Sequence, residues 1–186
     1  MTENFQSYKY FISHWDEIRN LILLDTKQKE IKKKYESVFK SYYNISMHFR
    51  MGDYKSITDS HPIMKDEYYD KSIETITTYN NDKNIQIVYF YEKNDETDVK
   101  LIIDSLEKKY TNITFTSVDH SIPDWEQLLL MSCCHSNIIA NSTFSWWAAY
   151  MNIEKEKVVC YPNNWFGKSL SSNNTNDLFP NEWVKI

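Results

Sequence analysis

The sequence has little glycine and little proline, with two and four residues respectively in a chain of 186. This scarcity excludes the glycine-rich loops that often cradle phosphates, because neither GxGxxG nor GxxxxGK[ST] occurs. A phosphate site in this chain must therefore be built from side chains and helix ends. The two glycines, Gly52 and Gly167, are expected to lie in loops with unusual backbone angles.

Cysteine is also scarce, and excess basic charge and long apolar runs are lacking. The three cysteines, Cys133, Cys134 and Cys160, do not form the even set of a disulfide framework, so we expect reduced core thiols. A formal net charge of −5 argues against a nucleic-acid partner, which normally needs a broad basic face. No signal peptide and no apolar run of membrane-spanning length is visible, which predicts a cytoplasmic protein.

Apolar residues, in contrast, make up 41% of the chain and aromatic residues 16%, which is enough for a packed core. After residue 42, runs rich in β-branched and aromatic residues alternate with amphipathic helical patterns. Strands are predicted at 44–49, 85–91, 113–118, 137–140 and 158–161, and helices at 62–79, 95–109, 123–134 and 142–151. This alternation predicts an α/β fold, a Rossmann-like parallel sheet with helices on both faces.

The first 42 residues show a different pattern. Apolar residues recur at helical spacing from Phe11 to about Lys40, which predicts a helical arm or linker over residues 1–42. We expect this arm to pack on a single domain formed by residues 43–186. The lysines at 32–34 are interpreted as a solvated helix face.

Two predicted strands end in loops with chemically active side chains, at residues 48–54 (HFRMGDY) and 141–147 (NSTFSWW). Parallel strands present their carboxyl ends at one edge of the sheet, where ligands bind in such folds. The planar guanidinium of Arg50 suits phosphate oxygens, and His48 points to the same side of its strand. The start of the helix at Ser142 offers N–H groups that favour an anion.

Simpler interpretations of these residues are also open. Arg50 could form a surface ion pair with Asp53, and Ser142 or Thr143 could only cap the helix. At least one ring of the pair at 146–147 is expected to be buried. His14, His61 and His120 lie in polar stretches that we expect to be exposed, and they are assigned no role.

The two loops together resemble the α-1,2-fucosyltransferases, glycosyltransferase family 11, which invert configuration and use GDP-fucose. The first family motif, approximately HxRRGDY, is matched by His48, Arg50 and residues 52–54. The second, approximately LMSxCKHxIIANSTFSWWxA, is matched at most positions of residues 130–149. The resemblance extends from about residue 5 to a Pro-x-x-Trp-Phe element at residues 162–166.

This resemblance implies the C-terminal, donor-binding domain of a GT-B enzyme, which transfers fucose to a sugar hydroxyl without a metal or other cofactor. The implied partners are GDP-fucose and a glycan acceptor, galactose-terminated in this family. Carried over to this chain, the donor-binding residues are His48, Arg50, Glu126, Asn141, Ser142, Thr143 and Phe144, and the catalytic residues are Arg50 and Asp53.

The chain departs from the family pattern at several positions. Met51 replaces a second arginine, Ser136 replaces the histidine of a Lys-His pair, and Gln127 replaces an aspartate implied to contact guanine, with Glu126 beside it. The N-terminal domain of the family does not precede the first motif here, so another chain is a candidate source of the acceptor-binding half. The alternatives are a non-catalytic nucleotide-sugar-binding module or fragment, and a flavodoxin-like interaction domain without a ligand.

Overall fold

The computed structural model of the protein describes residues 7–39, 42–80 and 83–186. Residues 1–6 and 40–41, which belong to the two ends of the predicted arm, lie outside this part of the chain. The division of the chain at residue 42 therefore stays a prediction.

The centre of the fold is a parallel sheet, which has six strands in the described part of the chain, in the order β3-β2-β1-β4-β5-β6. The strands are β1 (Tyr43–His48), β2 (Ile85–Phe90), β3 (Thr114–Ser117), β4 (Ser136–Ile138), β5 (Val159–Tyr161) and β6 (Val184–Lys185). The five predicted strands and their parallel arrangement are confirmed. The sequence pattern does not predict β6, because two residues are too few to show a period.

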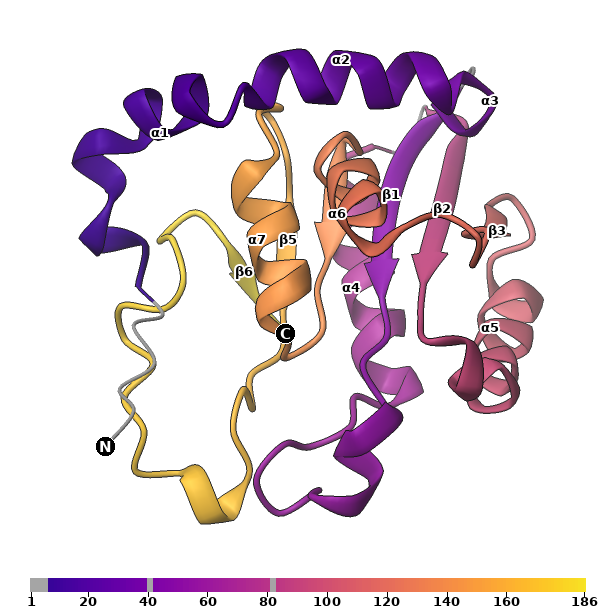
Figure 1. Cartoon of the computed structure of the whole chain (residues 1–186). Helices are drawn as coiled ribbons and strands as arrows, with labels where there is room; N and C mark the ends of the chain where they lie inside the picture. Colours follow the sequence, from indigo (N-terminus) through magenta and orange to yellow (C-terminus); the bar gives the residue numbers. More distant parts are fainter. Residues whose placement is uncertain (1–6, 40–41, 81–82) are drawn as a thin grey trace.

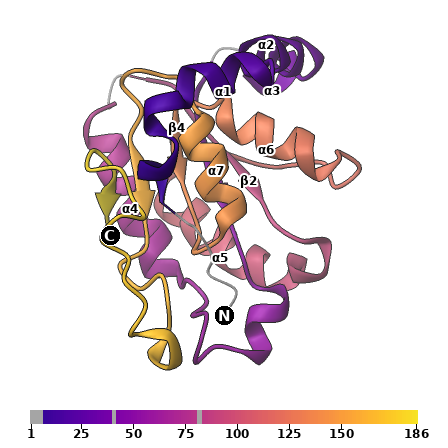
Figure 2. The same ribbon diagram turned by 60° about the vertical axis from the view of Figure 1, so that its left-hand side comes forward.

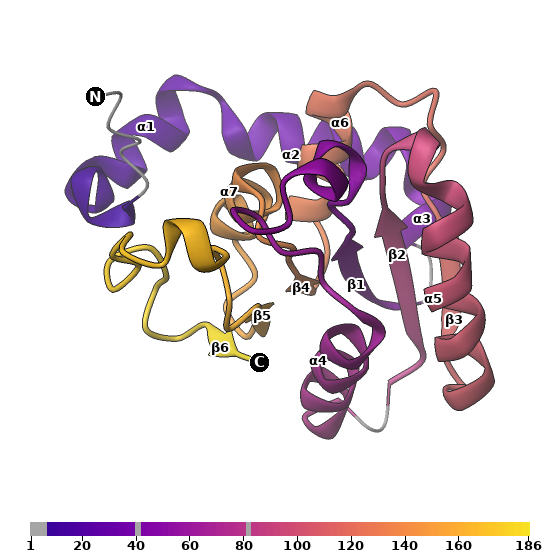
Figure 3. The ribbon, with the colours of Figure 1, turned by 90° about the horizontal axis from the view of Figure 1, so that it is seen from below.

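Helices cover both faces of this sheet, as predicted (Figure 3). On one face, α4 (Asp66–Thr78) and α5 (Glu96–Lys109) pack buried isoleucine, valine and leucine side chains against the central strands. On the other face lie α6 (Asp124–Ser132) and α7 (Thr143–Met151). The start of α4 is four residues later than predicted, because the carbonyl of Pro62 accepts a hydrogen bond from Asn141 Nδ2 at 2.9 Å instead of opening a helix.

The N-terminal arm is helical but not continuous (Figures 1 and 2). It consists of α1 (Trp15–Leu21), α2 (Leu24–Lys34) and α3 (Glu36–Phe39), preceded by two short 3₁₀ turns. The break falls at Leu23, whose φ of 54° is left-handed and cannot continue a right-handed helix. Leu24 and Ile31 are buried against α6, so the arm packs on the same face of the domain as α6 and α7.

The scarce residues identified in the sequence have clear structural positions. All three cysteines are free and buried, as predicted. Gly52 has a positive φ of 23°, as expected, and an added Cβ would lie 2.9 Å from a carboxylate oxygen of Glu92. The expectation is wrong for Gly167, whose φ is −81°; there glycine is needed because a Cβ would lie 2.3 Å from the carbonyl oxygen of Asp59.

Candidate functional site

A cleft of about 610 Å³ opens at the carboxyl edge of the sheet. Its walls come from the segments that follow β1 and β2, the approach to α6 and the start of α7. Figure 1 shows β1 and β2 ending on the side of the molecule where α7 begins. The two loops that the sequence placed at one edge of the sheet both contribute to this cleft, through His48, Arg50 and Tyr54 and through residues 142–144.

Arg50 enters the cleft two residues after β1 ends. Strand register pairs His48 with Phe90, so Arg50 and Glu92 leave neighbouring strands side by side. The Arg50 guanidinium donates to the Glu92 carboxylate and to Asp53 Oδ1, the latter at 2.6 Å, and lies 5.1 Å from the ring centre of Tyr54. The cation is therefore balanced by two carboxylates when no ligand is bound.

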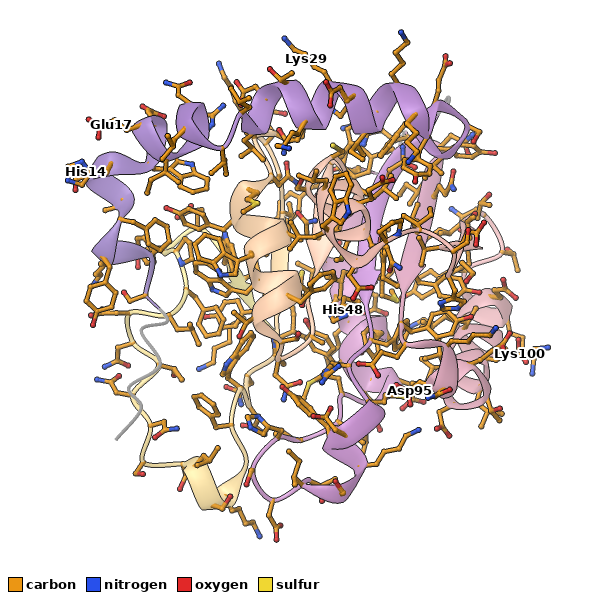
Figure 4. All side chains as sticks on the ribbon, viewed as in Figure 1. His14, Glu17, Lys29, His48, Asp95 and Lys100 are labelled. Carbon is orange, nitrogen blue, oxygen red and sulfur yellow. The ribbon has the colours of Figure 1, made fainter. Side chains whose placement is uncertain are left out.

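The loop that carries Arg50 is fixed by a buried carboxylate. Asp95, which is 2% exposed, accepts from the backbone N–H of Gly52 and from Lys55 Nζ, both at 2.7 Å. Hydrogen bonds from Lys55 to Asp95 and Asp98 raise the pKa of the Lys55 amine to about 12, so it stays charged. Figure 4 shows Asp95 at the connection between β2 and α5. This clamp joins the loop after β1 to the start of α5.

His48 is buried and lines the cleft, and Figure 4 shows it near the middle of the molecule. Burial, and secondarily the charge of Arg50, lowers the pKa of its imidazole from 6.5 to about 3. The ring is therefore neutral at physiological pH. Its buried Nδ1 has no protein partner in the described part of the chain, and its ring lies 5.7 Å from that of Phe144.

The other wall is formed by the start of α7. Ser142 is the N-cap residue, with extended backbone angles, but its side chain makes no capping hydrogen bond. The residue lines the cleft instead, together with Thr143 and Phe144. The positive end of the helix dipole therefore faces the same space as Arg50, an arrangement that favours an anion.

Asn141 and Tyr54 hold the two loops together. Tyr54 donates its hydroxyl to the Asn141 carbonyl at 3.2 Å, and the Asn141 amide donates to the carbonyls of Pro62 and Trp165. Asn141 is not among the residues that line the cleft. Its observed contacts are those of a residue that positions the loops.

Two further predicted site residues also lie outside the cleft lining. Glu126, which is buried, accepts from Lys34 Nζ at 2.8 Å and from the hydroxyl of Tyr35, so its carboxylate joins the arm to α6. The hydrogen bond from Lys34 lowers the pKa of the Glu126 carboxyl. Asp53 is exposed and reaches the site through its ion pair with Arg50.

The structure brings into the cleft several residues to which the sequence assigned no role. These are Glu92, Lys93, His120 and Asp124. Gln127, which stands where the family has the aspartate implied to contact guanine, also lines the cleft. The sequence interpretation of His120 as exposed is wrong, since it is half-buried and its Nε2 has no protein partner among the described residues. His61 is also half-buried, stacked 4.7 Å from the ring of Tyr54. In the sequence, only the positions of these residues after predicted strands or near predicted helix starts indicate that they could line the cleft.

Fold and cleft together define a Rossmann-like α/β domain with a polar cleft at the carboxyl edge of its sheet. Within the residues that the structure describes, no cluster of three or more His, Cys, Asp or Glu side chains could hold a metal ion. None of the helices in those residues is both long and apolar enough to cross a membrane.

The chain belongs to glycosyl transferase family 11, whose family model matches residues 2–186. It is 32% identical, over 76% of its length and 44% of the relative's, to the O-antigen biosynthesis glycosyltransferase WbnK of Escherichia coli. It is 28% identical, over 97% of its length and 60% of the relative's, to an alpha-1,2-colitosyltransferase of Escherichia coli. The matched region thus spans about half the length of these curated relatives.

Proposed function

We propose that this chain binds a nucleotide-diphosphate sugar, GDP-fucose, and forms the donor-binding domain of an α-1,2-fucosyltransferase. The observation that carries the proposal is the convergence of Arg50 and the start of α7 on one cleft. The family and the names of its relatives support sugar transfer, and one of those names specifies an α-1,2 linkage.

In this proposal, the diphosphate lies between Arg50 and the N-terminus of α7. The Glu92 carboxylate, which pairs with Arg50 in the free protein, is displaced from the guanidinium by the phosphate oxygens. His48, neutral and buried, borders the nucleotide, and its unpartnered nitrogen is available for a hydrogen bond. No step of this binding requires a metal ion.

Transfer itself would proceed with inversion at the anomeric carbon of fucose. An acceptor hydroxyl attacks this carbon as its bond to the β-phosphate oxygen breaks, and the GDP leaving group keeps the electron pair. Arg50 and the helix start stabilise the charge that develops on that oxygen. The proton of the hydroxyl passes to a base, for which we propose Asp53, the exposed carboxylate that pairs with Arg50.

Calorimetry with GDP-fucose, GDP-mannose and GDP tests the binding proposal. Arg50→Ala should weaken binding by about 1.5–3 kcal/mol, the range for hydrogen bonds to charged groups. The chain offers a matched control in Arg19→Ala, because Arg19 lies in the arm and pairs with Asp25. If the wild-type chain binds none of the three at millimolar concentration, the proposal fails; if Arg50→Ala binds unchanged, the role of Arg50 fails.

A second candidate function is that of a non-catalytic nucleotide-sugar-binding module. The observation in its favour is that Met51, which stands where the family motif has a second arginine, is buried in the apolar core and adds no charge to the cleft. Transfer of labelled fucose to a galactose-terminated acceptor, measured beside donor hydrolysis, separates the two. Binding without transfer, with or without a second chain, supports the module.

A further inference from the structure

Lys93 lines the cleft, but none of the contacts described above involves its ammonium group. The cationic Lys and Arg side chains of the lining are Arg50 and Lys93, and its acidic ones are Glu92 and Asp124. Arg50 is already balanced by Glu92 and Asp53. Lys93, in contrast, has no ion pair within the described part of the chain, where neighbouring Lys55 has two.

The backbone around Lys93 is held firmly relative to Arg50. On one side of it, Glu92 binds the Arg50 guanidinium. On the other side, Asp95 binds the N–H of Gly52, and the Asp95 N–H donates back to the Glu92 carbonyl at 2.7 Å. Lys93 therefore lies between Glu92 and Asp95, which both bind the loop that carries Arg50.

The position directly after Arg50 cannot supply a further cation. Met51 is buried in the apolar core with Ile45 and Phe49, only 4% exposed, so its side chain points away from solvent. A nucleotide-diphosphate sugar carries about two negative charges on its phosphates, and Arg50 alone cannot balance both. A second charge from the β2–α5 connection would complete the site.

We propose that Lys93 is a second phosphate-binding cation, acting together with Arg50 on the diphosphate of the donor. This inference rests on the proposed function, since it assumes a nucleotide-diphosphate ligand. As the diphosphate displaces Glu92 from Arg50, the Lys93 ammonium approaches the same oxygens from the neighbouring strand end. Lys93 thereby adds a second positive charge, which the buried side chain at position 51 cannot supply.

Calorimetry at low and at physiological ionic strength, with GDP, GMP and guanosine as probes, tests this role. Lys93→Met, which keeps the side-chain length and removes the charge, should weaken GDP binding about fivefold, the upper end for a solvent-exposed ion pair. Guanosine affinity should stay unchanged, and Lys93→Arg should restore GDP binding. The loss should shrink as salt is added, because exposed charges are screened.

Lys100→Met is the matched control, because it removes the same charge from the outer side of α5, where Figure 4 shows Lys100 pointing away from the molecule. An equal loss in both variants would mean a general field effect and would overturn the proposal. If Lys93→Met weakens GDP and guanosine binding equally, Lys93 does not act on the phosphates and only shapes the cleft. If GDP binding is unchanged, Lys93 does not contact the ligand. If the wild-type chain itself fails to bind GDP, the proposed function falls together with this inference.

Discussion

At the scale of single residues, the cleft contains its own competitor for a phosphate. Glu92 and Asp53 occupy the Arg50 guanidinium, and a diphosphate must replace at least one of them. These two carboxylates keep the guanidinium oriented in the free protein, but their negative charges weaken its attraction for an anion.

Glu92→Gln should therefore bind GDP more tightly than the wild type. Loss of the carboxylate removes both the competitor and a repulsive charge from the cleft, and we expect a gain of about 0.5–1 kcal/mol. Calorimetry measures it, with Glu96→Gln on the exposed start of α5 as the control for net charge. Weaker binding by Glu92→Gln would instead show that Glu92 positions Arg50 for the ligand.

His48 makes the stability of the folded chain depend on pH. Its folded pKa of about 3 lies below the unfolded value of 6.5, so between these values the unfolded chain binds the extra proton. The free energy of unfolding is therefore highest above pH 6.5 and decreases as the pH falls from 6.5 towards 3.

His48→Gln should flatten this part of the stability curve. The wild type should lose up to about 1.4 kcal/mol per pH unit through this one proton, and the variant should not. Urea unfolding at several pH values between 3 and 6.5 measures the slopes. The control is His14→Gln, because His14 is exposed at the edge of the arm in Figure 4; identical slopes in all three proteins would contradict the assignment.

At the scale of elements, the arm is attached to the domain by polar as well as apolar contacts. Gln28 of α2 is 3% exposed, and its amide donates to Ser132 Oγ at 2.9 Å and to the Met151 carbonyl at 3.0 Å. Those acceptors belong to the last turns of α6 and α7. One side chain thus fixes α2 against the ends of both helices.

Gln28→Ala should destabilise the chain by about 1–3 kcal/mol, because one buried and one part-buried acceptor lose their donor. Lys29→Ala, one residue further on the outer face of α2, should change stability by less than about 0.5 kcal/mol. Urea unfolding followed by tryptophan fluorescence measures both. Equal, small effects would mean that the hydrogen bonds of Gln28 do not hold the arm on the domain.

At the scale of the whole molecule, donor binding and folding stability are linked. A ligand that binds only the folded chain at a hundred times its Kd stabilises it by about 2.7 kcal/mol. For a chain of this size, GDP at such a concentration should raise the midpoint of thermal unfolding by about 5–10 °C. Scanning calorimetry measures the shift, and Arg50→Ala should lose most of it at the same GDP concentration. A shift that is equal in both proteins would place the nucleotide elsewhere.

The alternating pattern of the sequence determined much of this architecture by itself. Five strands, their parallel arrangement, the helices on both faces and the convergence of two loops followed from periods of two and 3.6 residues, because one face of each element must be buried. The residues at 48–54 and 141–147 also resembled the motifs of the family to which the chain belongs. All these features are local, or follow from general rules of chain connection.

Only the tertiary structure decided which side chains meet. Arg50 pairs with Glu92, 42 residues away, because the register of β1 and β2 aligns their ends. Glu126 turns to Lys34, 92 residues away, because the arm packs on α6. Such contacts depend on strand register and on helix orientation, which are set by the packing of remote segments. The sequence by itself determined at which edge of the sheet the two loops would meet, whereas tertiary packing decided that Glu92, Lys93 and His120 line the cleft there with Arg50.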